Sequence, residues 1–354
     1  MVLEDKQLTR ATLQAFVESS SDLQDENTAT KYPLAAAFPT EEVEDIRNVY
    51  DIVSNQIQAA ASVTGFNAAA PIKSKGQAKQ AIAALTKIQN AYYLDEVEIL
   101  NYRNPRTAAE RQNIIDNVLI ETNDLSVAVD DTKEYLRAQM AYNGKVNYQD
   151  ALTQSKIEFD LDRPEENDVT VSTPWGSADA EPITDLLAAV KQYQKTNGRK
   201  KPEVISMNST TYEKFIRSGQ VKTEIFGDST SPRIVKADDI NALLNAFKLP
   251  ALSIDDNVTV LENLDGTYEE KEHLQDDRVV LRAALLGSTM SGPNVENNHA
   301  KGKYVLTVIN EDPHTEKTIV GEVTLPVTKN VNGTVFLDVN PSGASEPEEE
   351  VPAG

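Results

Sequence analysis

The chain has 354 residues, a formal net charge of −22 at pH 7 and no cysteine, and 40% of its residues are hydrophobic. That hydrophobic fraction is typical of a folded protein rather than a disordered one. A strongly acidic surface repels phosphate backbones, so we expect no sequence-specific contact with nucleic acid. Without cysteine the chain forms no disulfides, thiolate nucleophiles or sulfur-based zinc sites.

The N-terminal stretch MVLEDKQLTRATLQAF carries acidic residues and has no apolar h-region, so the sequence predicts no secretory signal. It also contains no apolar run of about 18 residues, the length that a membrane-spanning helix requires. We therefore expect no membrane contact and a protein that is made and kept in the cytoplasm.

Residues 1–56 alternate polar and short apolar pieces with little periodicity. Thr40, followed by Glu41 and Glu42, is typical of a helix start, because acidic side chains stabilise the positive end of the helix dipole. We interpret this segment as an N-terminal arm, which is either a frayed terminus or an extended segment that a partner must bury.

Residues 57–103 begin with QAAASVTGFNAAAPIKSKG, which is poor in bulky side chains. Ser74 can cap a helix over residues 75–92, in which Ile82, Leu85 and Ile88 are spaced to share one face. The segment contains too little apolar volume for a core of its own, and we expect it to project from the body of the protein.

A single long helix is predicted from Thr107 to Gly144, about 55 Å long at the usual rise per residue. Thr107 with Glu110 fits a capping box, and Gly144 suits the left-handed residue that follows a helix end. The apolar residues recur at intervals of four and seven: Ile114, Val118, Leu125, Val129, Leu136 and Met140. Because Glu121, Thr122, Thr132 and Lys133 interrupt this stripe, a helix lying across a sheet of its own chain fits better than a coiled coil.

After Gly144 the apolar period changes to two, and strands are predicted in KVNYQDALTQSKIEFDLD and NDVTVSTPW. A helix follows Pro182 and ends before Gly198, and KKPEVISMNSTTYEKFIRSG reads as a buried strand followed by a helix. Hairpin turns are predicted at Asp265-Gly266 and at Asn332-Gly333, and the acidic tail 341–354 is predicted to be disordered. The fold class is therefore α+β.

No constellation of residues demands catalysis. His273, His299 and His314 lie far apart and are each interpreted as surface histidines. Asp160 with Asp162, and Asp255 with Asp256, could serve as acid and base, but chance pairs are expected among 56 acidic residues. We expect no catalytic, cofactor-binding or metal site and therefore no enzyme.

One basic cluster, formed by Arg199, Lys200 and Lys201, is unusual in so acidic a chain. It is either a solvated loop, which we favour, or a contact between subunits.

The order of these parts resembles the major capsid proteins of tailed bacteriophages, and more narrowly the lambda-type major capsid protein E family. The likeness rests on TGFNAAAPIKSKGQAKQAIAALTKIQNAYYLDEVEI, on the long helix closing at YNGKVNY, on TPWGSADAEPITDLL and on KPEVISMNSTTYEKFIRSG. It covers most of residues 30–325.

The resemblance implies an HK97-type capsid fold with an N-terminal arm, E-loop, long spine helix, peripheral domain and axial domain. The implied segments are the N-terminal arm (1–56), the E-loop (57–103), the peripheral domain (104–184, spine helix 106–143), the axial domain (185–317), a return to the peripheral domain (318–340) and a disordered acidic tail (341–354). The implied function is a structural subunit that assembles into hexamers and pentamers of an icosahedral shell around double-stranded DNA.

The same resemblance implies that the chain acts in the virion capsid after assembly in the host cytoplasm. Its expected partners are copies of itself, a separate scaffolding protein, a portal protein and a decoration protein. Three other interpretations stay open: an encapsulin-like compartment shell, a Gram-positive surface protein suggested by the Val- and Thr-rich strands, and an enzyme of unknown class.

Overall fold

The computed structural model describes residues 2–23, 31–52, 79–151, 154–312 and 314–341. The chain divides into two compact units. Unit 1 comprises Met1–Asp51, Gln80–Met140 and Gly287–Lys329, and unit 2 comprises Ile52–Lys79, Ala141–Leu286 and Asn330–Gly354. Residues 287–317 therefore lie in the same unit as the long helix, whereas residues 141–184 and 330–340 lie in unit 2; the domain bounds that the resemblance implied follow neither division.

Unit 1 contains the helices α1 (Arg10–Leu23), α3 (Glu96–Arg103) and α4 (Ala108–Ala138), and the strands β1 (Thr40–Glu42), β4 (Thr86–Leu94), β13 (Gly287–Ser291), β14 (Tyr304–Glu311) and β15 (His314–Thr328). The strands β2 (Arg47–Ile52) and β3 (Lys79–Ala84) pair with each other where the chain passes between the units.

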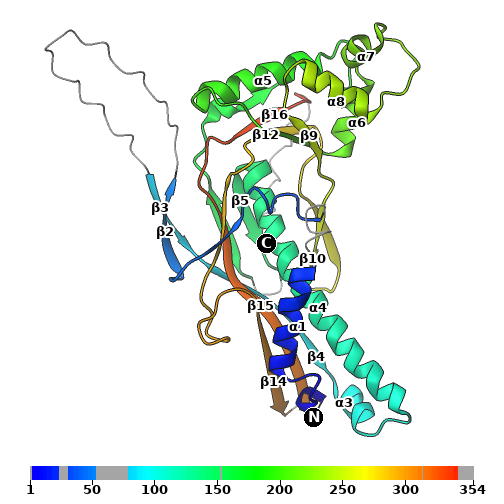
Figure 1. The fold of residues 1–354 in the computed structure, drawn as a ribbon, viewed down its shortest axis with the longest axis vertical. Helices are drawn as coiled ribbons and strands as arrows, with labels where there is room; N and C mark the ends of the chain where they lie inside the picture. The colour runs from blue at the N-terminus through cyan, green and yellow to red at the C-terminus, as the bar shows by residue number, and fades with distance from the viewer. Residues whose placement is uncertain (1, 24–30, 53–78, 152–153, 313, 342–354) are drawn as a thin grey trace, which may run out of the picture. The chain divides into compact units, whose positions relative to one another are not determined.

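Strand β15 organises the sheet of unit 1 (Figure 1). Along one edge it pairs antiparallel first with β14 and then with β13, and β1 extends the sheet by a parallel pairing with β13. Along its other edge it pairs antiparallel with β4, from Glu316↔Leu94 to Thr324↔Thr86. Because three strands depend on one, β15 fixes their register with respect to one another.

Helix α4 packs against β15 and β4, so the prediction of a helix lying on a sheet of its own chain is confirmed (Figure 1). Of the predicted stripe, every member except the half-buried Ile114 is buried. Thr107 accepts a hydrogen bond from the Glu110 amide at 3.2 Å, but the Glu110 carboxylate accepts from the Arg106 amide rather than completing a capping box. A π-helical turn at Gln139–Asn143 follows α4, and Gly144 ends it at φ +68°.

One polar interruption of the stripe, Lys133, belongs to an ion cluster that joins α4 to the sheet. Lys133 Nζ lies 2.8 Å from an oxygen of Asp130 and 2.8 Å from one of Glu322 on β15. Lys303 Nζ lies 2.6 Å from the other Asp130 oxygen and donates to Ser126 Oγ at 2.8 Å. We call Asp130, Lys133, Lys303 and Glu322 the α4 ion cluster.

The two lysines of this cluster have pKa values shifted in opposite directions. Burial opposes the charge of Lys133, but Glu322 and Asp130 outweigh burial and raise its pKa. For Lys303, burial dominates over its one close carboxylate and lowers the pKa. Burial also acts to raise the pKa of Asp130, yet Lys133 and Lys303 together lower it.

The described N-terminal residues belong to the core of unit 1. Val2, Leu8 and Leu13 are fully buried, and α1 packs against β14 and α4. Farther along, Leu34 donates its backbone N–H to Glu134 of α4 at 2.7 Å. The expectation of an arm that only a partner buries is therefore wrong for these residues.

The helix start predicted at Thr40 is also wrong, because residues 40–42 form strand β1. Their backbone pairs with β13, and the amide of Val43 continues the pairing by donating to the Ser291 carbonyl at 2.9 Å. These hydrogen bonds come from a strand distant in the sequence, and no local pattern reports them.

The helix predicted over residues 75–92 is wrong where the structure describes it. Residues 79–84 and 86–94 are the strands β3 and β4, and β4 is an integral strand of the unit 1 sheet. Residues 86–103, assigned from the sequence to a projecting segment, thus lie within unit 1, where Leu94 and Ile99 are buried. Residues 57–78 of the predicted E-loop and residues 342–354 of the predicted disordered tail (341–354) lie outside the described residues.

Unit 2 contains the helices α5 (Pro182–Thr196), α6 (Ser209–Arg217), α7 (Gly219–Phe226) and α8 (Ala237–Ala246), and the strands β5 (Lys145–Gln149), β6 (Lys156–Asp160), β7 (Asp168–Thr170), β8 (Val204–Met207), β9 (Ala251–Ile254), β10 (Val258–Glu262), β11 (Tyr268–Glu272), β12 (Arg278–Arg282) and β16 (Thr334–Asp338). Its main sheet has the order β7-β16-β12-β8-β9, while β5–β6 and β10–β11 are separate two-stranded sheets.

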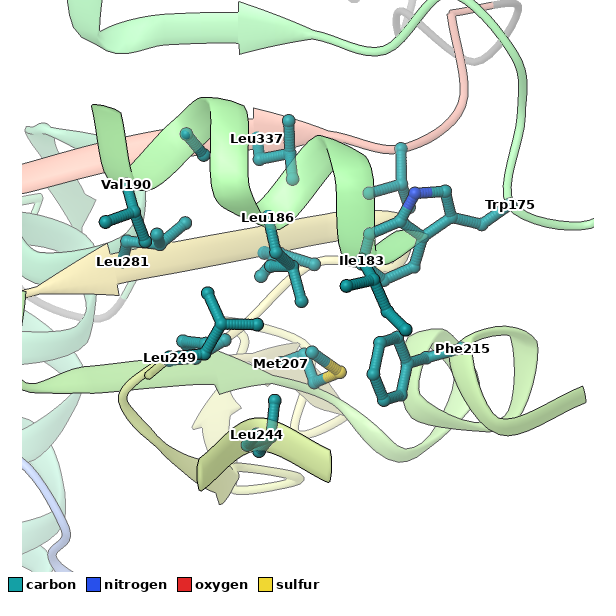
Figure 2. Packing of buried hydrophobic residues seen from close by; sticks show 14 of the residues in the cluster. Trp175, Ile183, Leu186, Val190, Met207, Phe215, Leu244, Leu249, Leu281 and Leu337 are labelled. Atoms are coloured by element: carbon teal, nitrogen blue, oxygen red, sulfur yellow. The ribbon is translucent and has the colours of Figure 1, made fainter. Parts of the chain in front are cut away.

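The core of unit 2 lies between this sheet and its helices (Figure 2). Leu186 and Val190 of α5 point toward Leu281 of β12 and Leu337 of β16, as Figure 2 shows. Trp175, the single tryptophan, packs at 5.6 Å between ring centroids against Phe215 of α6. The helix predicted after Pro182 is confirmed as α5, and the helix predicted within KKPEVISMNSTTYEKFIRSG is confirmed as α6, whose N-cap residue is Asn208.

Of the two predicted hairpin turns, one is confirmed. Gly266 adopts φ +77° between the antiparallel strands β10 and β11. Asn332-Gly333 also forms a turn, with the Gly333 amide donating to the Asn330 carbonyl, but β15 and β16 on either side of it belong to different sheets. β16 instead lies between β12 and β7, and its Val335, Phe336 and Leu337 are all buried, as is typical of an interior strand covered on both faces.

Candidate functional site

The histidines singled out in the sequence do not come together. His273 is buried and its Nε2 lies 2.7 Å from the hydroxyl of Thr259, so its interpretation as a surface residue is wrong. His299 is exposed in a loop, and His314 is half-buried at the start of β15. Among the described residues, no group of three or more histidine and carboxylate side chains could hold a metal ion.

The aspartate pairs act as local structural groups. Asp160 and Asp162 are exposed, and the first accepts a hydrogen bond from the backbone amide of the second at 3.2 Å. Asp256 binds the amide and hydroxyl of Ser209 at the start of α6, where a carboxylate stabilises the helix dipole. In the second pair, Asp256 is exposed whereas Asp255 is buried.

Asp255 is buried and accepts a hydrogen bond from Tyr142 at 2.6 Å. Burial, reinforced by the charge of Asp255, raises the pKa of Tyr142. The contact secures the residues that follow α4 to the strand end of β9 within unit 2.

The described helices are all too short or too polar to cross a lipid bilayer.

The surface features that can support a function are exposed apolar side chains. In unit 1, Tyr93, Val97 and Leu100 are 64%, 62% and 58% exposed at the end of β4 and on α3. α3 is held there by a capping box, in which Asp95 accepts from the Glu98 amide at 2.8 Å and Glu98 accepts from the Asp95 amide at 3.1 Å. Large apolar side chains in such numbers on a surface mark contact sites for other molecules.

In unit 2 the exposed apolar side chains gather on the β10–β11 hairpin. Val258, Val260, Leu264 and Tyr268 are 44%, 55%, 70% and 71% exposed. The register pairs Val258 with Glu272, Val260 with Glu270, and Glu262 with Tyr268. Residues directly opposite each other in an antiparallel pair share a face, so one face carries only these apolar groups and glutamates.

We call this surface the acidic face; it consists of Val258, Val260, Glu262, Tyr268, Glu270 and Glu272. The opposite face of the same hairpin carries the buried Thr259 and an ion pair between Lys271 and Glu269. The hairpin is predicted from the sequence, but this face was not predicted as a functional surface. The signal was present in the period-two alternation of Val258 and Val260.

The basic cluster lies in the turn between α5 and β8, and Arg199, Lys200 and Lys201 are all exposed. Gly198 and Arg199 both have left-handed backbone conformations, with φ of 58° and 67°, which turn the chain away from the helix axis. Cations at this position also complement the negative end of the α5 dipole. We call these three residues the basic loop.

Comparison with known proteins matches residues 34–339 to the profile of a family described as phage major capsid protein E. No curated protein matches the chain.

Among solved structures, a capsid protein of a prophage from E. coli CFT073 is 15% identical, with a TM-score of 0.49, over 74% of this chain and 80% of that one. A phage-related protein from Bordetella bronchiseptica RB50 is 11% identical, also with a TM-score of 0.49, over 88% of this chain and 92% of that one. The capsid of cyanophage P-SCSP1u is 11% identical, with a TM-score of 0.44, over 85% and 86% of the two chains.

Proposed function

Since the chain belongs to the phage major capsid protein E family and is a structural capsid protein, we propose that its copies assemble as hexamers and pentamers into an icosahedral shell around double-stranded DNA. The observation that carries this proposal is the family match over residues 34–339, which extends through both units. The HK97-type capsid fold is the one this family implies, and the mixed helices and strands agree with it.

Within such a shell, we assign the peripheral domain to unit 1 and the axial domain to unit 2. This assignment keeps α4 as the spine helix and moves residues 287–317 from the axial to the peripheral domain. It also moves residues 141–184 and 330–340 from the peripheral to the axial domain. The paired strands β2 and β3 flank the remaining part of the proposed E-loop. Exposed apolar groups on α3 and on the acidic face support the proposal, because a shell subunit must offer contact surfaces in each of its domains.

The proposed partners are further copies of the chain, a separate scaffolding protein, a portal protein and a decoration protein. The proposed location is the virion capsid, assembled in the host cytoplasm. The net charge of −22 supports one more element of the proposal, because an acidic surface keeps the subunits from adhering to the DNA during packaging.

The test is to express the full chain alone and with a scaffolding protein, and to examine the products by sedimentation and electron microscopy. We expect closed shells or open sheets built from six-membered and five-membered rings. A small monodisperse monomer under every condition would contradict the proposal. Particles that enclose a copurifying enzyme rather than nucleic acid would instead favour an encapsulin-like compartment.

A further inference from the structure

The acidic face of the β10–β11 hairpin has no partner within the described residues. Its three carboxylates, Glu262, Glu270 and Glu272, are exposed and form no ion pair with any described residue; the hairpin's ion pair, Lys271 with Glu269, lies on the other face. A two-stranded sheet is only marginally stable by itself, so an uncovered face with three large apolar side chains gains stability when another surface covers it.

The basic loop carries exposed positive charges, opposite in sign to those of the acidic face. Arg199, Lys200 and Lys201 are exposed, and in the described part of the chain none of them forms an ion pair. Their backbone is nevertheless well anchored, since the Arg199 amide donates to the Gln194 carbonyl at 2.8 Å and the Lys200 amide to the Asn197 carbonyl at 3.1 Å. Three cations are thus held on a defined turn, and they match the three carboxylates of the acidic face in number.

The topology of unit 2 keeps these two surfaces apart. The basic loop lies just before Val204, where β8 begins, and the hairpin follows Ile254, where β9 ends. β8 and β9 are parallel, with Val204 opposite Ala251 and Met207 opposite Ile254. The two surfaces therefore lie at opposite ends of one sheet, separated by at least about 10 Å of strand, and Figure 1 shows α5 and β10 on different sides of it.

We propose that the acidic face of one copy docks on the basic loop of the next copy around a ring. This inference rests on the proposed shell function and names the surfaces that one of its contacts uses. Complementary surfaces at opposite ends of a subunit form a head-to-tail contact, and such contacts close into rings when the rotation between copies permits. The apolar side chains supply contact area, and the opposed charges set the orientation.

Two charge-reversed variants of the full chain test the contact. The hairpin variant carries Glu262→Lys, Glu270→Lys and Glu272→Lys, and the loop variant carries Arg199→Glu, Lys200→Glu and Lys201→Glu. Each variant places like charges across the contact, so we expect the particle yield to fall by more than about tenfold. Combining all six substitutions in one chain restores opposite charges and should restore the particles.

Mixing the two single-surface variants gives a sharper outcome. The hairpin variant presents positive charge on both surfaces and the loop variant presents negative charge on both, so the two attract only when they alternate. A six-membered ring can alternate, whereas a five-membered ring must contain at least one like-charged contact. We expect the mixture to form hexamers, flat sheets or tubes in electron micrographs, without closed shells.

A control variant carries Glu213→Lys, Glu224→Lys and Glu269→Lys. These exposed residues of unit 2 lie off the acidic face, and the change in net charge equals that of the hairpin variant. We expect this control to assemble like the unmodified chain. Circular dichroism and thermal unfolding establish that every variant is folded, and the loop variant tests the contact independently if the hairpin variant is not.

The outcomes separate this inference from the function on which it rests. If the unmodified chain forms no particles under any condition, the shell function itself fails. If it assembles and both charge-reversed variants assemble equally well, the contact is refuted while the function stands. If the hairpin variant alone fails and the six substitutions together do not restore it, the acidic face meets a scaffolding or decoration protein, and the proposal is likewise overturned.

Discussion

Replacing Lys133 of the α4 ion cluster with methionine tests how α4 is held on its sheet. Lys133 bridges Asp130 on its own helix and Glu322 on β15, each at 2.8 Å. Methionine keeps most of the length and apolar volume of the side chain but removes the charge. Glu322, which is 4% exposed, then loses its ion pair and keeps the hydrogen bond that the Ser291 hydroxyl donates to it at 3.0 Å.

The expected loss in the free energy of unfolding depends on which carboxylate each substitution leaves without its ion-pair partner. Removing one partner of a buried ion pair costs about 3–5 kcal/mol, so Lys133→Met should lower the free energy of unfolding by that amount. Lys303→Met leaves Asp130 still paired with Lys133, so its cost should be only about 1–3 kcal/mol. The opposite pKa shifts of the two lysines agree with this order, because the folded protein favours the charge of Lys133 and disfavours that of Lys303.

A double-mutant cycle isolates the pair. In Lys133→Met with Glu322→Leu, no uncompensated charge stays buried, so we expect the double variant to be more stable than Lys133→Met alone. The assay is urea unfolding of the unassembled full chain followed by far-ultraviolet circular dichroism. Hydrogen exchange of peptides from α4 shows whether the loss is local to this helix.

The pH dependence supplies a second readout. The raised pKa of Lys133 means that its contribution is fully present below the unfolded value, about 10.4, and is lost as the pH rises through the folded value. The lowered pKa of Asp130 means that its contribution is lost as the pH falls from about 3.9 through the folded value. An equal cost for Lys133→Met and Lys303→Met, or a cost below about 1 kcal/mol for both, would refute the reasoning.

Two further predictions concern a close backbone approach and a half-buried carboxyl group. A methyl group added at Gly287 would overlap the backbone carbonyl of Val327, so Gly287→Ala should destabilise unit 1 by about 1–3 kcal/mol in the same unfolding assay. Gly176→Ala, where no atom lies within 4 Å of the added group, should change stability by less than about 0.5 kcal/mol. Burial raises the pKa of Asp185, which accepts a hydrogen bond from Trp175 at 3.0 Å, so Trp175 fluorescence should titrate with a midpoint above about 3.9. The stability that the protonated Asp185 contributes is then lost as the pH rises through that midpoint, and Asp185→Asn should abolish the transition; a midpoint at or below the ordinary value contradicts the argument.

Several helices and turns could be predicted from the sequence because their signals come from residues close together in the chain. Thr107 caps α4, the spaced apolar residues of its stripe are buried except for the half-buried Ile114, and Gly144 takes the left-handed conformation that follows the helix end. The Asp265-Gly266 turn is equally local, because glycine adopts a positive φ without steric cost. The family resemblance, read from the order of such elements, is confirmed by the match over residues 34–339.

Residues 79–94 illustrate where local reasoning failed. The alanine-rich sequence has high helix propensity, and the spacing of Ile82, Leu85 and Ile88 fits a helical face. β4 nevertheless forms because β15 supplies a continuous row of backbone partners from Thr86 to Leu94. Hydrogen bonds with a strand more than 200 residues away outweigh a propensity difference of about 0.5 kcal/mol per residue.

The candidate contact surfaces were likewise predictable from the sequence only in part. The basic character of residues 199–201, the hairpin over residues 258–272 and the length of α4 each depend on residues close together in the chain, so they can be predicted from it. The burial of His273, the ion pair of Lys133 with Glu322, and the position of the acidic face and the basic loop at opposite ends of one sheet emerge only when the chain is folded. Burial and charge pairing depend on which distant strands become neighbours, and strand pairing follows the energy of the whole sheet rather than that of any one segment.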